Sequence, residues 1–162
     1  MKTDYLNLYS NLNEFEQIIL KSTKDWVDKY VRPDIEKSFI SGIPLSLKNE
    51  LAELGAFGSI FPEKYGGLDF SFIAFGLMMK ELEKGDSSIR VSSSIQTSLV
   101  MNAIFSYGSE YQKEKYLPDL ANGTIVGSFA MSEPSHGSDI SNLKTKFKIV
   151  DDKIILNGSK LW

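Results

Sequence analysis

The sequence predicts a mainly α-helical domain followed by the beginning of a β-domain. Apolar residues recur at steps of three and four through the first 125 residues, which is the spacing of one helix face. Capping residues precede these runs, and Gly or Pro follows them. After Gly123 the apolar period falls to about two, as in strands. We therefore expect a helical domain over 1–125 and an incomplete β-domain over 126–162.

The first two helices are predicted on either side of a break at Pro33. Asn13 and Glu16 form a capping pair at the start of a helix that ends before this proline. A second helix opens at Pro44, because proline suits a first turn, and it stops at Gly55. One face of this second helix carries Leu47, Leu51 and Leu54.

A broken stretch separates these helices from the next two. Its prolines and glycines predict a loop over 56–69. A third helix spans 72–83 and is apolar enough in its first turns to be buried. Asp86 caps a fourth helix, which runs to Tyr107 and is closed by Gly108.

A fifth helix and a set of strands complete the predicted elements. Ser109 and Gln112 form a capping box, and Pro118 with Gly123 brings the fifth helix to an end. We expect about three strands after that, in a number too small to close a sheet. They are predicted over 125–132, 144–150 and 153–156, with the last two joined as a hairpin at Asp151-Asp152.

The composition excludes several classes of chemistry. The 162 residues include no Cys and a single His, His136, so disulfides, iron–sulfur clusters, thiol nucleophiles and multi-histidine metal sites are excluded. We therefore expect no metal site. The 18 basic and 21 acidic residues are interleaved, which argues against a nucleic-acid surface.

The sequence also favours an interior compartment. No apolar run approaches the ~20 residues that span a bilayer. The first ten residues show neither a secretory nor an organellar leader. We expect a cytoplasmic protein of a bacterium, or a mitochondrial-matrix protein if the source is eukaryotic.

The segment Phe129-Ala-Met-Ser-Glu-Pro-Ser-His-Gly-Ser-Asp139 is the most informative for chemistry. Its successive N–H groups and hydroxyls can converge on an anion such as a pyrophosphate. A polar loop that joins two strands is the alternative. Neither the dinucleotide-binding glycine motif nor a P-loop is present, so a bound nucleotide is held in another way.

A second cluster lies on the predicted fourth helix. Arg90, Ser94, Thr97 and Met101 follow at steps of four, three and four, which predicts a polar groove along one face. An arginine beside small hydroxyls can bind a carboxylate through paired, charge-assisted hydrogen bonds. The alternative is an exposed ion pair between Arg90 and Asp86, worth only about 0.3–0.5 kcal/mol.

These segments resemble the acyl-CoA dehydrogenase family, FAD enzymes that desaturate acyl-CoA thioesters between Cα and Cβ. The segment 129–139 is similar to the flavin-binding loop of the family, and 157–162 is similar to its next signature. Further matches are Tyr65-Gly66-Gly67 and Tyr107-Gly108-Ser109-Glu110. The resemblance implies the N-terminal helical domain of the family, followed by the truncated start of its middle β-domain.

The resemblance implies FAD as the cofactor. Met131 and Ser132 are expected near the isoalloxazine, Ser138 where cofactor and CoA meet, and Trp162 against the flavin ring. From the residue alone, an aromatic packed on a strand is the favoured interpretation of Trp162, and His136 is expected to be a solvated loop histidine without a catalytic role. The implied cofactor-binding residues are Phe129, Ala130, Met131, Ser132, Glu133, Pro134, Ser135, His136, Gly137, Ser138 and Trp162.

The segment 88–101 resembles the glutaryl-CoA dehydrogenase branch of the family. In that branch an Arg and the Ser four residues later bind the far carboxylate of glutaryl-CoA, and Arg90 and Ser94 stand at those places. The implied substrate-binding residues are Arg90, Val91, Ser94 and Ser138, although Val91 departs from the small polar residue expected there. The implied reaction passes a hydride to FAD and can continue by decarboxylation to crotonyl-CoA.

No residue matches the catalytic glutamate of the family, so we assign no catalytic residue to this chain. We expect the chain to be inactive alone and to need a C-terminal half or a homo-oligomer, with electron-transfer flavoprotein as the electron acceptor. One alternative is a non-catalytic helical module that binds acyl-CoA or a protein. The other is a fragment of a short-chain fatty acyl-CoA dehydrogenase.

Overall fold

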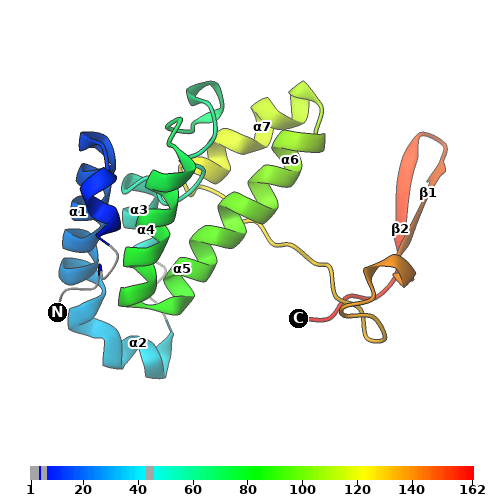
Figure 1. Ribbon diagram of the computed structural model, residues 1–162. Coiled ribbons are helices and arrows are strands. Elements are labelled where there is room, and N and C mark those ends of the chain that lie inside the picture. The colour runs from blue at the N-terminus through cyan, green and yellow to red at the C-terminus, as the bar shows by residue number, and fades with distance from the viewer. Residues whose placement is uncertain (1–3, 5–6, 43–45) are drawn as a thin grey trace. The chain divides into compact units, whose positions relative to one another are not determined.

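A computed structural model describes residues 4, 7–42 and 46–162 of the chain (Figure 1). It divides into two compact units, residues 1–127 and 128–162, which we call the helical unit and the loop–hairpin unit. The predicted start of the second helix at Pro44 lies outside the described residues. Within the described ranges, no helix is both long and apolar enough to cross a membrane.

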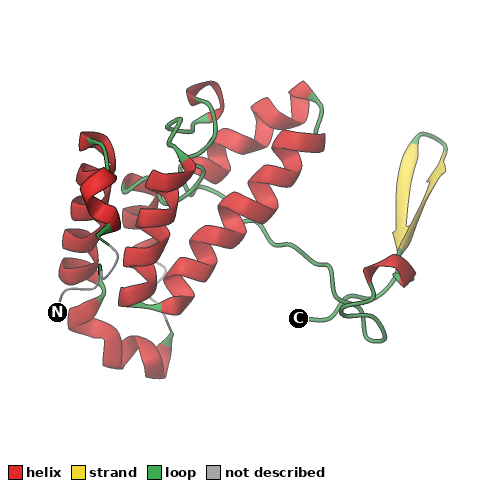
Figure 2. Ribbon diagram, in the orientation of Figure 1, coloured by secondary structure: helices red, strands yellow, loops and turns green. Residues whose placement is uncertain are grey.

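The predicted mainly helical fold is confirmed (Figure 2). The helices are α1 (Glu14–Tyr30), α2 (Ile35–Ser41), α3 (Leu47–Glu53), α4 (Phe72–Gly85), α5 (Ser87–Ser94), α6 (Asn102–Tyr107) and α7 (Glu110–Ala121). A π-helical segment, Ile95–Met101, joins α5 to α6 in one continuous rod (Figure 1). Short 3-10 turns lie at Leu8–Asn11, Arg32–Asp34, Glu63–Tyr65 and Ile140–Asn142.

The predicted helix-start signals are confirmed. The Asn13 side chain accepts the Glu16 N–H at 2.9 Å, and the Glu16 carboxylate accepts the Asn13 N–H at 3.1 Å. Asp86 caps α5 through its side chain. Ser109 Oγ accepts the Gln112 N–H at 3.3 Å, while the Gln112 side chain accepts the Ser109 N–H at 2.8 Å. These side chains satisfy N–H groups that have no partner within a helix.

Three details of the helices differ from expectation. After the break at Pro33 the chain forms the additional helix α2, because a proline is tolerated in a first turn. Pro118 lies inside α7 and does not end it; the chain leaves the helix before Gly123, which has a φ of 73°. The first turn of α4 is buried only at Ala74, since Phe72 and Ile73 are 81% and 59% exposed.

Two apolar clusters form the interior of the helical unit. α1 packs against α4, and α4 packs against α5 (Figure 1). The first cluster consists of Ile19, Trp26, Val27, Val31, Leu51, Ala56, Phe57, Ala74, Met78, Leu82 and Ile89. The second consists of Phe61, Tyr65, Met101, Leu117, Leu120 and Ala121, with Phe105 packed against it. Both clusters contain residues of the segment 56–69.

The segment 56–69 is irregular, as predicted, but it is packed inside the helical unit. Ala56, Ser59 and Phe61 are buried. The carbonyl oxygen of Ser59 accepts the N–H groups of Leu68 and Phe70, so the segment folds back on itself. A buried connection of this kind must satisfy its own backbone groups, and these hydrogen bonds do so.

The loop–hairpin unit contains the predicted hairpin. β1 (Lys146–Val150) pairs antiparallel with β2 (Lys153–Asn157), with Phe147 opposite Leu156. The turn residues Asp151 and Asp152 have φ values of 48° and 57°, which matches the twist that a two-residue hairpin needs.

The predicted strand over 125–132 is wrong. This segment has no strand partner within the described residues. Its backbone is instead held in part by a side chain, because Gln96 binds the C=O of Ile125 and the N–H of Gly127.

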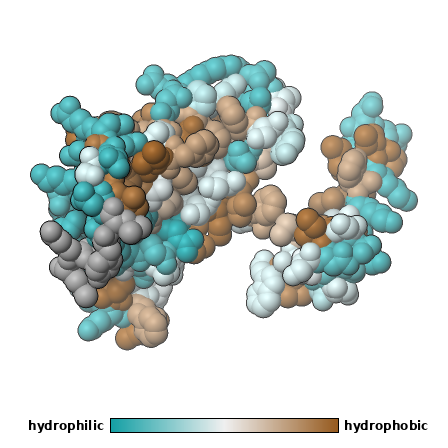
Figure 3. All heavy atoms as spheres, viewed as in Figure 1, coloured by the Kyte–Doolittle hydropathy of each residue, from teal (hydrophilic) through white to brown (hydrophobic). Residues whose placement is uncertain are grey.

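The hairpin has one apolar face. Phe147 pairs with Leu156 and Ile149 with Ile154 across the two strands, so these four side chains share a face, while Ile155 lies opposite Lys148 on the other face. All four are at least 64% exposed, and Figure 3 shows apolar residues on this hairpin. The loop–hairpin unit alone does not cover this face.

Candidate functional site

The loop 129–138 is anchored by one buried carboxylate, that of Glu133. Its two oxygens accept the N–H of Lys144 at 2.6 Å, the N–H of Thr145 at 2.9 Å and the Lys160 Nζ at 3.1 Å. The Lys144 N–H, followed by the Thr145 and Lys160 donors, lowers the pKa of Glu133 to about 2. The carboxylate is therefore ionised at neutral pH, and it joins three separate segments of the loop–hairpin unit.

A tight turn follows this anchor. Glu133 and His136 exchange backbone hydrogen bonds of 2.9 and 3.1 Å, with Pro134 and Ser135 at the tip. Proline at the second position of such a turn fixes the backbone angle that the turn needs. Within the described part of the chain, the N–H groups of Gly137 and Ser138 bind no intramolecular acceptor. These donors, beside exposed serine hydroxyls, are available to an anion.

The C-terminal signature lies beside the first half of this loop. Lys160 Nζ donates to the Met131 C=O at 2.9 Å, and the Leu161 N–H donates to the Ser132 C=O at 2.9 Å. The structure thus brings Met131 and Ser132 together with the segment that leads to Trp162. The Trp162 side chain is fully exposed, so the alternative of an aromatic packed on a strand is wrong.

Large apolar side chains flank the anchored loop without being buried. Phe129 is 48% exposed and Met131 is 42% exposed. Exposed aromatic and thioether groups and free N–H donors in one loop are the chemical groups that suit a flat ring with an attached phosphate. The residues of this loop therefore fit a flavin nucleotide.

His136 differs from the expected solvated histidine. The ring is half-buried, and its Nδ1 atom is shielded from solvent without a hydrogen-bond partner among the described residues. The loop therefore leaves one buried polar atom unsatisfied among the described residues, which is uncommon in a finished interior.

The second predicted site, on α5, is an ion pair between neighbouring helices. Arg90 pairs with Glu83 of α4, so the alternative pairing with Asp86 is wrong. The Arg90 hydrogen bond lowers the pKa of Glu83. Ser94, one turn further along, donates from Oγ to the Met79 Sδ at 3.6 Å. Arg90 and Ser94 are both half-buried, while Val91 is 36% exposed.

The predicted polar groove does not extend past Ser94. Thr97 is fully buried, accepts the Gly58 N–H at 2.9 Å and lies 3.4 Å from the Ala56 C=O. Met101 is fully buried in the second apolar cluster. The π-helical segment changes the number of residues per turn here, so a step count based on 3.6 residues fails.

The sequence interpretation missed Gln96, which is buried beside Thr97. Its Nε2 donates to the Leu120 and Ile125 carbonyls at 2.9 and 3.0 Å, and its Oε1 accepts the Gly127 N–H at 2.9 Å. The side chain thus uses both of its donor hydrogens and its acceptor oxygen to hold the end of the helical unit. Gln96 is polar and its partners lie 24 to 31 residues away along the chain, so helical spacing gave no signal for it.

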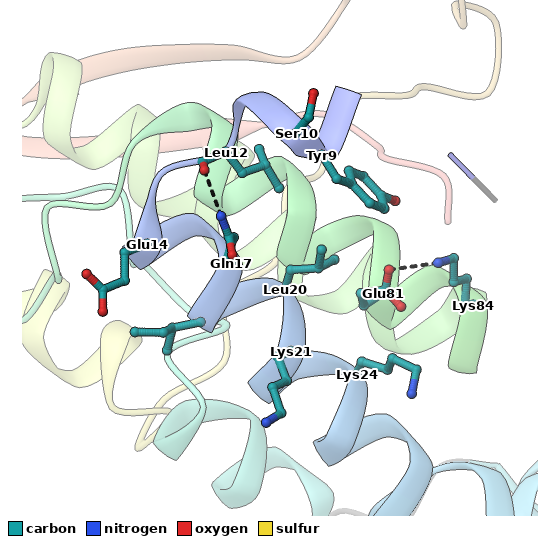
Figure 4. Close-up of a pocket in the computed structure, with 11 residues that line it drawn as sticks. Tyr9, Ser10, Leu12, Glu14, Gln17, Leu20, Lys21, Lys24, Glu81 and Lys84 are labelled. Atoms are coloured by element: carbon teal, nitrogen blue, oxygen red, sulfur yellow. Dashed lines mark hydrogen bonds and ion pairs between the residues drawn. The ribbon is translucent and has the colours of Figure 1, made fainter. Parts of the chain in front are cut away.

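An open groove of about 700 Å³ lies between the first 3-10 turn, α1 and α4 (Figure 4). Lys84 binds the Glu81 carboxylate at 2.7 Å on one side, and Gln17 binds the Leu12 C=O at 2.9 Å on the other. No residue that the sequence predicted for a site lines this groove.

Comparison with known proteins identifies the family. The model of the acyl-CoA dehydrogenase N-terminal domain matches residues 13–124. The chain belongs to the acyl-CoA dehydrogenase family. Among curated relatives, the probable acyl-CoA dehydrogenase YngJ of Bacillus subtilis is 34% identical over 152 residues, which are 93% of this chain and 40% of that protein.

Solved structures of other acyl-CoA dehydrogenases have the same fold. A glutaryl-CoA dehydrogenase from Mycobacterium smegmatis in complex with FADH2 superimposes with a TM-score of 0.92 at 35% identity, over 97% of this chain and 41% of that one. Butyryl-CoA dehydrogenase from Megasphaera elsdenii gives 0.85 at 36% identity, over 93% and 40%. The chain therefore spans about two fifths of the length of these relatives.

Proposed function

We propose that this chain supplies the N-terminal domain and the flavin-binding loop of an FAD-dependent acyl-CoA dehydrogenase. The observation that carries this proposal is the anchored loop 129–138, which contains both free N–H donors and exposed apolar side chains. FAD, when bound, accepts a hydride from the acyl chain.

The residues of the loop have distinct parts in this proposal. The N–H groups of Gly137 and Ser138 hold the pyrophosphate, and the Ser132 hydroxyl donates to the pyrimidine side of the flavin. A donor there favours reduction because electron density gathers on that side of the ring. Met131 and Trp162 cover the ring and exclude water.

The proposed substrate is glutaryl-CoA. Arg90 presents a guanidinium at the protein surface next to the Ser94 hydroxyl, and this pair suits the far carboxylate of a diacid thioester. In the structure the Arg90 guanidinium binds the carboxylate of Glu83. A substrate carboxylate would share or replace that contact. Removal of the α-proton and transfer of the β-hydride to FAD would give the unsaturated diacid thioester, which would then lose its far carboxyl as carbon dioxide to give crotonyl-CoA. Electron-transfer flavoprotein is the proposed acceptor, and the assembly is proposed to be a homo-oligomer.

Flavin binding tests the cofactor. The purified chain is titrated with FAD alone and after co-expression with the C-terminal part of the enzyme, while the visible absorption is recorded. We expect the co-expressed protein to carry stoichiometric flavin. A colourless complex that gains no flavin on addition of FAD would leave only a non-catalytic binding module.

Substitution of Arg90 tests the substrate. In the completed enzyme, Arg90→Ala removes a charge-assisted hydrogen bond worth about 1.5–3 kcal/mol, so kcat/KM for glutaryl-CoA should fall about 10- to 100-fold. The value for butyryl-CoA, which has no second carboxylate, should change little.

The chain offers a matched control for this experiment. Arg32 is the other arginine, and it forms an exposed pair with Asp28 at 2.6 Å. Arg32→Ala should leave kcat/KM for both substrates unchanged. Equal losses for glutaryl-CoA and butyryl-CoA in Arg90→Ala would contradict the proposed role and favour a short-chain acyl-CoA substrate.

A further inference from the structure

We propose that Glu133 is a positioning residue that sets the geometry of the flavin-binding loop, with Lys160 as its partner. This inference rests on the proposed function and assigns a role to a residue that does not itself need to touch the cofactor. It follows from the contacts of one buried carboxylate with three segments of the loop–hairpin unit: 129–138, 144–145 and 160–162.

The environment of Glu133 requires a carboxylate. Two consecutive N–H groups, from Lys144 and Thr145, and one ammonium group converge on its two oxygens. A carboxylate is the side chain that accepts on both oxygens and donates on neither. Glutamine has nearly the same shape but turns an NH₂ group toward one of these donors. Because Glu133 is only 6% exposed, water cannot readily replace the lost acceptor.

Lys160 links the Glu133 carboxylate to the residues that are proposed to face the flavin. Its Nζ binds both the Glu133 carboxylate and the Met131 C=O, at 3.1 and 2.9 Å. The next residue, Leu161, donates its N–H to the Ser132 C=O at 2.9 Å. Met131, Ser132 and the backbone leading to Trp162 are thus held in one frame. Loss of the Glu133 charge removes the counter-ion that keeps Lys160 in place.

The first experiment measures, without FAD, how firmly the hydrogen bonds around Glu133 and Lys160 are held. Backbone amide exchange is followed by NMR in the 162-residue chain for the wild type, Glu133→Gln and Lys160→Met. We expect the Lys144 and Thr145 amides to exchange at least tenfold faster in Glu133→Gln, and the Leu161 amide to do so in both variants.

A control variant separates this effect from a loss of charge in general. Asp151→Asn removes one carboxylate from the hairpin turn of the same unit, and asparagine tolerates the positive φ found there. It should leave exchange at these amides unchanged. Amides of α1 in the helical unit should keep their wild-type chemical shifts in all variants. Unchanged exchange at Lys144, Thr145 and Leu161 in Glu133→Gln would overturn the positioning role.

The second experiment measures the flavin. In the protein co-expressed with the C-terminal part of the enzyme, Glu133→Gln and Lys160→Met should each raise the Kd for FAD at least tenfold and shift the visible absorption of the remaining bound flavin. Asp151→Asn should change neither. Faster exchange combined with wild-type FAD affinity and spectrum would overturn the inference. Absence of flavin in the wild-type protein would reject the proposed function, and the exchange data alone would then decide the contacts of Glu133.

Discussion

At Gly67 the backbone passes so close to Phe61 that no side chain can be accommodated. A Cβ atom at this position would lie 1.8 Å from the carbonyl oxygen of Phe61 and 2.3 Å from its carbonyl carbon. Both are backbone atoms, so they cannot move aside as a flexible side chain could. The close approach is part of the folded-back segment 56–69, which supplies buried residues to both apolar clusters.

Gly67→Ala should therefore destabilise the helical unit strongly. We expect a loss of more than about 2 kcal/mol in the free energy of unfolding, because the backbone of two residues must shift. Urea unfolding followed by circular dichroism measures this value.

Gly76 provides the matched comparison. It lies inside α4 with no atom within 4 Å of the place where a Cβ would be. Gly76→Ala should stabilise the protein by about 0.5–1 kcal/mol, since alanine loses less backbone entropy in a helix. Similar effects of the two substitutions would contradict the close approach at Gly67.

Hydrogen bonds between residues that are close in the sequence were predictable, whereas those between residues far apart in the sequence were not. Asn13 and Ser109 cap their helices through partners three residues away, so the sequence alone contains both halves of each interaction. Glu133 and Gln96 bind backbone groups that lie between 11 and 31 residues away along the chain. No spacing rule connects such positions. Glu133 was predicted only as one member of a loop.

At the start of α7, the carboxylate of Glu110 joins this helix to the segment 56–69. Glu110 accepts hydrogen bonds from the Tyr65 hydroxyl at 2.8 Å, Lys64 Nζ at 3.2 Å and Lys113 Nζ at 3.0 Å. The Lys113 hydrogen bond, followed by those of Tyr65 and Lys64, lowers the pKa of Glu110 to about 2. The first turn of a helix also favours a negative charge.

This shift predicts an acid dependence of stability. Because the folded-state pKa of Glu110 lies below the ordinary value of a glutamate, about 4.3, its contribution to stability is complete above that value and is lost as the pH falls toward about 2. The melting temperature of Glu110→Gln should therefore fall less between pH 5 and pH 3 than that of the wild type.

Glu114→Gln serves as the control for this element. Glu114 lies one turn further along α7 and is 3.7 Å from Lys64 Nζ. Its substitution should leave the pH dependence of the melting temperature close to that of the wild type. If the melting temperatures of Glu110→Gln and the wild type fall equally between pH 5 and pH 3, the ionised Glu110 carboxylate does not stabilise the folded protein.

Elements that depend on local chemistry were predicted well. The hairpin follows from alternating apolar residues around two aspartates that tolerate positive φ. The strand over 125–132 was wrong because the competing partner, Gln96, comes from another helix. α2 was missed because it is short and its apolar side chains are exposed, Phe39 and Ile40 to about nine-tenths. A helix that buries no face against a core shows no repeat of apolar residues at steps of three and four.

At the scale of the whole molecule, the chain consists of two separate compact units. The connection contains the exposed residues Ile125, Val126 and Phe129 and forms no regular element. An exposed irregular connection between packed units is a preferred place for proteases. The boundary between the helical domain and the β-domain, predicted from the sequence near residue 125, stays a prediction.

Limited proteolysis should cut this connection first. Thermolysin cleaves before large apolar residues, so we expect early products that end between residues 124 and 128, identified by mass spectrometry. Apolar sites inside α4 should be cut at least tenfold more slowly, because opening them requires unfolding of the first apolar cluster. Cleavage in α4 at an equal rate would show that the helical unit has little stability of its own.

The π-helical segment has a consequence for how the long rod can change. One residue added to or removed from a helix rotates everything beyond it by about 100° around the axis. A π-helical turn accommodates one extra residue without this rotation, so deleting a single residue from 95–101 would restore ordinary winding and leave Arg90 beside Glu83 and Phe105 against Tyr65. The irregular winding thus preserves the phase between the two ends of the rod, and a repair of the helix would keep both contacts.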